Sequence, residues 1–144
     1  INAGGKIVLI PEVVIDYTAR DTISKMARMY YQYGLFKPLV NKKLGAPATI
    51  RQFFPLFFVL GLVFGGLVSV FLPILWYAYV SVLSVYLLLS LYFSFKIAIT
   101  QKTKMFLLVL PFVFFIIHVS YGWGYLCGIF KLIFKQRFAV HVNR

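Results

Sequence analysis

Two kinds of side chain in this sequence could take part in proton transfer: a pair of carboxylates and a histidine in an apolar run. Glu12 and Asp16 are four residues apart and would face the same side of a regular strand, as a general acid and base could. Pro11 beside them disfavours regular strand geometry, so we interpret them as loop or salt-bridge carboxylates. His118 is an ionisable group within an apolar run, which makes it a functional candidate. We nevertheless interpret it as a neutral histidine hydrogen-bonded to a neighbouring helix.

Cys127 is the only cysteine, so no disulfide can form within the chain. It lies in an apolar run and is interpreted as a small packing residue. The cysteine and the two histidines lack the spacing of metal ligands, and the sequence has neither a phosphate-binding loop nor a nucleophile elbow. We therefore predict no catalytic residue and no metal site within these 144 residues.

The stretch from Tyr17 to Pro38 is the only long amphipathic segment that carries charge. Asp21 is a suitable N-cap, which predicts a helix over 22–35 that Gly34 and Pro38 close. Two sets of residues would occupy different faces of this helix, an apolar–aromatic set of Ile23, Met26, Tyr30 and Tyr33 and a polar set of Lys25, Arg28 and Gln32. Such a helix next to an apolar span suits the membrane–water interface, the alternative being an ordinary packed helix with a solvated basic edge.

The composition is that of an integral membrane protein, with 62% hydrophobic residues and a mean hydropathy of +0.89. The chain has 15 basic and 3 acidic residues, a balance that often indicates nucleic-acid binding. Here the basic residues flank apolar runs rather than forming one polar patch. We therefore expect a bilayer with anionic lipids as the partner and no nucleic acid.

Three uncharged runs, at about 53–72, 74–95 and 105–130, predict about three transmembrane helices within residues 53–144, which also include a basic tail. Pro73 separates the first two runs, which should form a tight hairpin. The small-residue pairs Gly61/Gly65 and Gly124/Gly128 would allow close helix packing. Basic residues before the first run and around 96–104 place the N-terminal side in the cytoplasm. A third full span sends the basic tail outside, so either that rule is overridden or the last run crosses incompletely; we favour three spans.

Residues 1–16 predict short strands, at Lys6–Ile10 and at 13–15, that cannot form a core alone. Residues 17–52 comprise the interfacial helix and a basic connector at 37–52, whose last residues could begin the next helix. The chain opens with Ile1 in the middle of a pattern, so we expect a fragment of a longer protein. The predicted fold class is mainly α and integral to the membrane, with a short N-terminal β segment, an amphipathic interfacial helix and about three transmembrane helices.

Most of the chain resembles the C-terminal membrane region of family 2 glycosyltransferases, especially those of the succinoglycan type that make exopolysaccharide. The matching features are Gly4–Ile7 as a GGKI strand, Pro11, the pair Tyr17 and Arg20, Arg28 followed by Tyr31-Gln32-Tyr33-Gly34, the connector into Arg51, Pro55 in the first span, and the run from His118 to Gly128. The resemblance implies that residues 1–16 are the end of a cytoplasmic GT-A catalytic domain that otherwise lies upstream.

In such enzymes that domain holds a divalent metal, Mg or Mn, and the nucleotide-sugar, and it transfers sugar to a lipid-linked or polysaccharide acceptor. The matching helix closes over the active site, which would give Arg28, Gln32 and Tyr31 contacts with the acceptor or the diphosphate. The family often has glutamine directly after the arginine, whereas this chain has Met29. The resemblance also implies a multi-pass protein of the bacterial inner (cytoplasmic) membrane.

The alternative is a small stand-alone multi-span membrane protein, such as a transporter subunit or an assembly partner. A transporter would be expected to carry more polar residues inside its spans. Apart from His118, the spans contain only serines and tyrosines as polar side chains.

Overall fold

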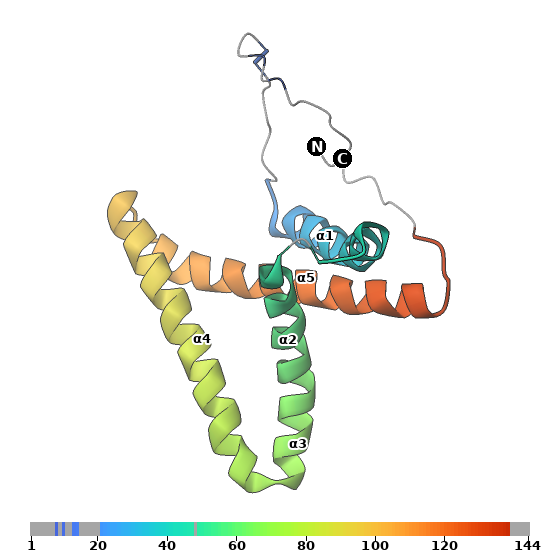
Figure 1. Cartoon of the computed structure of the whole chain (residues 1–144). Helices are drawn as coiled ribbons and strands as arrows, with labels where there is room; N and C mark the ends of the chain where they lie inside the picture. The colour runs from blue at the N-terminus through green and yellow to red at the C-terminus, as the bar shows by residue number, and fades with distance from the viewer. Residues whose placement is uncertain (1–7, 9, 11–12, 15–20, 48, 139–144) are drawn as a thin grey trace.

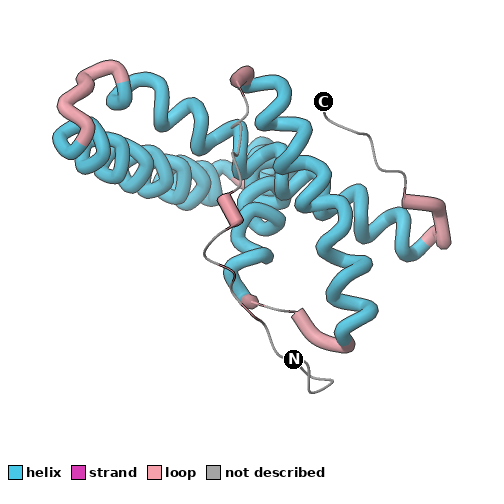
Figure 2. Tube along the Cα trace, turned by 90° about the horizontal axis from the view of Figure 1, so that it is seen from above, coloured by secondary structure: helices cyan, strands magenta, loops and turns pink. Residues whose placement is uncertain are grey.

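The computed structural model describes residues 8, 10, 13–14, 21–47 and 49–138, and every regular element within them is a helix (Figures 1 and 2). This confirms the mainly α class. The predicted N-terminal β segment lies mostly outside the described residues, and the described residues of that segment, 8, 10, 13 and 14, are not in a strand. The assignment of residues 1–16 to the end of a soluble domain stays a prediction.

The amphipathic helix α1 runs over Ile23–Leu44, nine residues beyond its predicted end. Its N-cap is Thr22, whose hydroxyl accepts a hydrogen bond from the backbone N–H of Lys25 at 3.3 Å, so the prediction of Asp21 as the cap is wrong. Asp21 instead forms an ion pair with Lys25, with Nζ and Oδ1 3.0 Å apart. The helix ends at Gly45, whose φ of 73° is the left-handed conformation that glycine adopts readily.

The predicted stop signals of α1, Gly34 and Pro38, lie inside the helix and are buried. Proline costs a helix one hydrogen bond, and glycine lowers its intrinsic stability. Both residues lie against α5 (Phe106–Ile133), and this packing keeps the helix continuous through them. The predicted basic connector at 37–52 is therefore shorter than expected, because its first part belongs to α1.

The first apolar stretch is Ile50–Phe71, made of a 3-10 turn η1 (Ile50–Phe53), α2 (Phe54–Leu60), a π-helical turn η2 (Gly61–Gly65) and α3 (Gly66–Phe71). Leu72 breaks this stretch, with φ −124° and ψ 88°, and Pro73 opens the next helix. A proline is well placed there because the first turn of a helix leaves its N–H unused. The predicted break at Pro73 is confirmed.

The returning helix α4 (Pro73–Thr100) continues through Lys96, beyond the predicted span of about 74–95. A lysine can extend its long side chain from an apolar helix toward the headgroups, so its charge need not end the helix. Three small residues spaced four apart, Ser90, Ser94 and Ala98, are buried on α4. The Ser94 hydroxyl donates to the Ser90 carbonyl at 2.7 Å, so this stripe buries a hydroxyl that has a partner.

The helices form a V-shaped hairpin, α2–α3 and α4, whose open end is closed by α5 (Figure 1). Helix α1 lies on the far side of α5 from the hairpin tip, and α5 packs chiefly against α1, α2 and α4. Three stretches are long and apolar enough to cross a membrane: Ile50–Phe71, Pro73–Thr100 and Phe106–Ile133. The chain therefore has the architecture of a multi-pass membrane protein.

Candidate functional site

The crossing of α1 over α5 is the most extensive helix contact in the described structure, and glycines make it possible. A Cβ added to Gly34 of α1 would lie 2.8 Å from the backbone nitrogen of Tyr125 and would strike the carbonyl of Tyr121. A Cβ on Gly124 would strike the carbonyl of Tyr31, and one on Gly128 that of Leu35. The two backbones are thus in direct contact, which confirms that Gly124 and Gly128 serve close helix packing.

A third glycine of α5, Gly122, faces a different neighbour. A Cβ there would strike the carbonyl of Pro55 and lie 2.6 Å from a methyl group of Val59, so this face receives α2. The other predicted small-residue pair is different, because Gly61 has nothing within 4 Å of an added Cβ and Gly65 meets only the ring of Tyr79. The prediction of close helix packing is therefore wrong for Gly61 and holds for Gly65, which lies against Tyr79 of α4; both glycines lie in the π-helical turn.

Polar side chains hold the crossing together at one point. The amide nitrogen of Asn41 in α1 donates to the hydroxyl of Tyr125, which is 3% exposed, at 2.9 Å. The amide oxygen of Asn41 and that of Gln52 are buried and have no hydrogen-bond partner among the described residues. The ring of Tyr125 also packs on Phe53, with centroids 5.7 Å apart. Tyr125 thus joins α1, the start of the first apolar stretch and α5.

The three predicted site residues, Arg28, Tyr31 and Gln32, face different surroundings. Tyr31 points at α5, where burial raises the pKa of its phenol and the neighbouring Cys127 raises it further. Arg28 is exposed near the start of α1 and makes no ion pair within the part of the chain that the structure describes. The face that packs on α5 consists of Tyr31, Gly34, Leu35 and Pro38, and so coincides with neither predicted face of the helix.

Gln32 lies in a groove of about 610 Å³ along the part of α1 that α5 leaves uncovered. The described residues that line this α1 groove are Gln32, Tyr33, Phe36, Lys37, Val40 and Tyr121. It offers one cation, one amide, two phenols and two apolar side chains, a set that fits an anionic headgroup with attached sugar or hydrocarbon. The sequence prediction missed Lys37 because it ended the helix at Leu35. The spacing of 32, 33, 36, 37 and 40 is one continuous helical face once α1 is extended.

His118 is a packed side chain within an aromatic cluster of Phe58, Tyr86 and Phe115. Its Nδ1 lies 2.7 Å from the carbonyl oxygen of Phe114 in its own helix, so this nitrogen is best described as an N–H donor. The hydroxyl of Tyr86 on α4 is farther from the same nitrogen, at 3.4 Å. The expected bond to a neighbouring helix is therefore secondary to a bond within α5.

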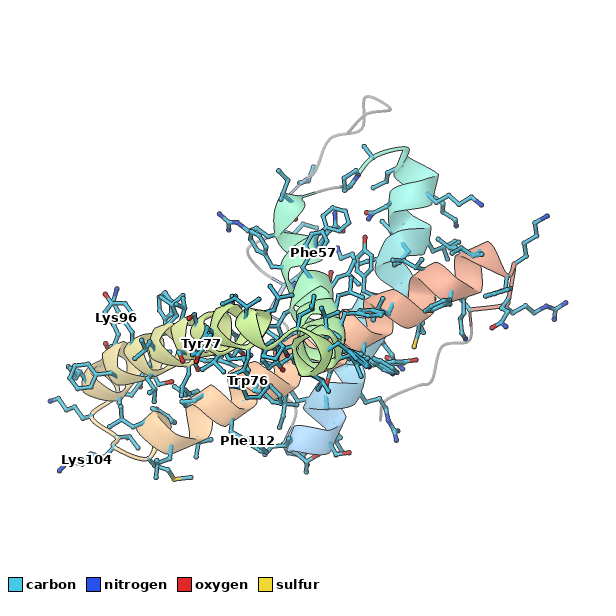
Figure 3. All side chains as sticks on the ribbon, turned by 90° about the horizontal axis from the view of Figure 1, so that it is seen from below. Phe57, Trp76, Tyr77, Lys96, Lys104 and Phe112 are labelled. Carbon is cyan, nitrogen blue, oxygen red and sulfur yellow. The ribbon has the colours of Figure 1, made fainter. Side chains whose placement is uncertain are left out.

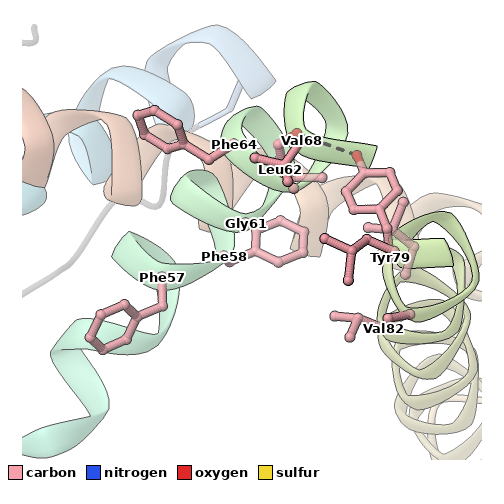
Figure 4. Close-up of a pocket in the computed structure, with 12 residues that line it drawn as sticks. Phe57, Phe58, Gly61, Leu62, Phe64, Val68, Tyr79 and Val82 are labelled. Carbon is pink, nitrogen blue, oxygen red and sulfur yellow. Dashed lines mark hydrogen bonds between the residues drawn. The ribbon is translucent and has the colours of Figure 1, made fainter. Parts of the chain in front are cut away.

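A second, mostly apolar crevice of about 420 Å³ lies inside the V between α2–α3 and α4 (Figure 4). Phe58, Leu62 and Val82 line it, and the hydroxyl of Tyr79, which also lines it, donates to the Leu62 carbonyl at 3.3 Å. Because this hydroxyl is already bonded to the backbone, the walls suit hydrocarbon.

Glu12 and Asp16 lie outside the described residues. Within the described ranges, no three His, Cys, Asp or Glu side chains come together as a metal site would require. No protein-family model, no curated protein and no solved structure matches this chain in the three comparisons.

Proposed function

We propose that this chain is the membrane-anchoring part of a family 2 glycosyltransferase of exopolysaccharide biosynthesis. The full enzyme would transfer a sugar from a nucleotide-sugar, with Mg or Mn bound in its catalytic domain, to a lipid-linked or polysaccharide acceptor. The observation that supports the proposal is that α1 packs on α5 at backbone contact while its polar face, with Gln32 and Lys37, stays uncovered. An enzyme that acts on a membrane-held acceptor needs such a rigid, basic surface beside the bilayer.

The side chains on that flank suit the acceptor end of the reaction. Arg28 is exposed, and a guanidinium can bind a phosphate group through two parallel hydrogen bonds. Lys37 and Gln32 line the α1 groove beside the rings of Tyr33 and Tyr121. We assign acceptor contacts to Arg28, Gln32 and Lys37. Tyr31, which faces Cys127, is assigned a packing role instead.

Sugar transfer in membranes that contain the protein with its whole reading frame tests this proposal. Labelled nucleotide-sugars are supplied with Mg or Mn, and the lipid and polysaccharide fractions are counted. Loss of a charge-assisted hydrogen bond costs about 1.5–3 kcal/mol, so Arg28→Ala should lower kcat/KM roughly 10- to 150-fold. Arg28→Lys should recover only part of this activity, because lysine keeps the charge without the two-pronged geometry.

Lys43→Ala is the matched control, since Lys43 is an exposed cation of the last turn of α1, outside the groove. It removes one positive charge without touching the proposed acceptor contacts, and activity should stay close to wild type. Equal activity of Arg28→Ala and Lys43→Ala would refute the role of Arg28. Absence of transfer from every nucleotide-sugar, with the protein correctly inserted, would favour the stand-alone membrane protein.

A further inference from the structure

Helix α5 is apolar and 28 residues long, so its length and composition alone would let it cross a bilayer. Its packing places it differently. The C-terminal half of α5 lies against α1, through Gly124 beneath Tyr31 and Gly128 beneath Leu35 and Pro38. Directly after α5, the ring of Phe138 packs on Phe36 of α1 with centroids 5.7 Å apart. The end of α5 therefore lies beside the middle of α1.

Helix α1 is too polar to lie in the hydrocarbon core, since Lys25, Arg28, Lys37, Lys42 and Lys43 all belong to it. If α5 crossed the bilayer from its start to its end, Gly124 and Gly128 would lie in the far half of the membrane. The basic residues of α1 would then be carried into or across the core, where each charged side chain is costly. The contact between α1 and α5 is thus incompatible with a full crossing by α5.

The start of α5, like its end, lies at the open end of the hairpin, away from the α3–α4 tip (Figure 1). Leu107 lines a small cavity of about 340 Å³ together with Phe95, Ala98 and Ile99 of the last turns of α4 and with Lys102 and Lys104 of the preceding loop. Seen from below, Lys96 and Lys104 lie at this corner, and α5 extends from it at full length while α2 is foreshortened (Figure 3). In the side view α5 runs across the open end of the hairpin and away from its tip (Figure 1).

The middle of α5 also lies at the open end of the hairpin (Figure 1). Gly122 touches Pro55 and Val59, which belong to the first turns of α2, rather than the α3–α4 tip. The large apolar side chains that α5 exposes without a ring partner recur at helical spacing on one face, namely Leu108, Phe112, Trp123 and Phe130. The spacing of Gly124 and Gly128 puts the α1 contact on the opposite face. Helix α5 thus has α1 above it and an unpartnered apolar face below.

We propose that α5 lies in the plane of the cytoplasmic leaflet and does not cross the bilayer, so that the chain crosses only twice. The exposed apolar face of α5 contacts acyl chains, and α1 covers its other face. Cations at both ends of α5 meet anionic headgroups, with Lys102 and Lys104 at the start and Lys131, Lys135 and Arg137 at the end. Every basic residue that the structure describes then lies on one side, and the conflict over the basic tail disappears.

Single-cysteine labelling tests this topology without any need for sugar transfer, so its outcome is independent of the proposed function. The background is Cys127→Ser, which removes the only cysteine and keeps a small polar side chain beside Tyr31. Single cysteines then replace Leu44 at the end of α1, Tyr77 near the hairpin tip and Gln136 after α5, all of which are exposed. A membrane-impermeant maleimide is added to sealed vesicles of either orientation.

We expect the cysteines at 44 and 136 to react from the cytoplasmic side and the cysteine at 77 from the opposite side. Reaction of 136 together with 77 would show that α5 crosses, and would overturn the proposal. Reaction of all three from one side would overturn it too, because the hairpin would then not cross. Detergent-solubilised protein is the control, in which all three positions should react and so report a folded, accessible cysteine.

Discussion

Alanine at Gly124 should release α1 from α5. An added Cβ would lie 2.9 Å from the carbonyl carbon of Tyr31 and 3.1 Å from the nitrogen of Leu35, besides striking the Tyr31 oxygen. Carbon atoms in contact prefer separations of about 3.5–4.0 Å, so the helices must move apart along the crossing. All three obstacles are backbone atoms, which cannot rotate aside as a side chain would.

The expected cost follows from this overpacking. Inserting a methyl group into a closely packed contact typically costs about 1–3 kcal/mol. Alanine itself favours the helix over glycine by about 0.5–1 kcal/mol, but this gain in α5 is the same whether α1 is docked or detached, so it does not offset the loss of docking. Gly61→Ala separates the two effects, because an added Cβ at Gly61 has nothing within 4 Å and changes only helix propensity.

Trypsin can measure the release, since α1 carries Lys25 and Arg28. In liposomes that contain the protein, cleavage within α1 tracks the population of the detached helix when docking is fast relative to cleavage. A cost of about 1–3 kcal/mol raises that population roughly 5- to 150-fold, and the cleavage rate should rise equally. Gly61→Ala should be cleaved no faster than wild type. If Gly124→Ala were cleaved at the wild-type rate while inserted normally, the direct backbone contact between α1 and α5 would be refuted.

Three further changes test neighbouring features of α1. Tyr125→Phe removes the acceptor of the Asn41 amide and leaves a buried donor unpaired, which should cost about 1–3 kcal/mol and speed trypsin cleavage of α1 accordingly. The pKa of Asp21 is lowered from 3.8, chiefly by the hydrogen bond from Lys25. The ionised Asp21 carboxylate therefore stabilises the first turn of α1 above pH 3.8, and this stabilisation is lost as the pH falls through the lowered pKa of the folded protein. Amide hydrogen exchange of the first turn should show this acid dependence, and Asp21→Asn should abolish it. Burial, aided by Cys127, raises the pKa of Tyr31 above 10.0, so docking of α1 should be at full strength below that pH and weaken above it; Tyr31→Phe should remove the dependence in the same cleavage assay.

The sequence predicted those parts of the fold that depend on local chemistry. Uncharged runs long enough to span a bilayer, and a proline between two of them, suffice to predict the hairpin and its break at Pro73. The end of α1 could not be predicted in this way. Gly34 and Pro38 are helix-stop signals in isolation, and only contact with Tyr121, Tyr125 and Gly128 of α5 turns them into packing residues. Tertiary contacts overrode local propensity there.

The candidate site shows the same difference between what local sequence predicts and what tertiary contacts decide. Gln32 could be selected from the sequence because its polarity marks an open face of α1, and it does line the α1 groove. Lys37 and Tyr121 could not, the first because the helix was ended too early and the second because it comes from α5. Tyr31 was selected through the family resemblance, yet its helical position turns it toward Cys127. Residue type indicates which chemistry is available, whereas the crossing of two helices decides which side chains share a surface.

The glycines of α5 show how one apolar run can specify two partners. Gly122 and Gly124 are two residues apart, so they point to different faces of a helix, whereas Gly124 and Gly128 are one turn apart and share a face. The first face admits α2 and the second admits α1, both at the level of backbone contact. High hydropathy in this run therefore has a cause besides bilayer crossing. Helix α5 is covered by α1 on one face and by α2 and α4 on others. Under the proposed topology acyl chains cover the remainder, which leaves no face for water and accounts for a helix that is apolar all round even where it lies flat.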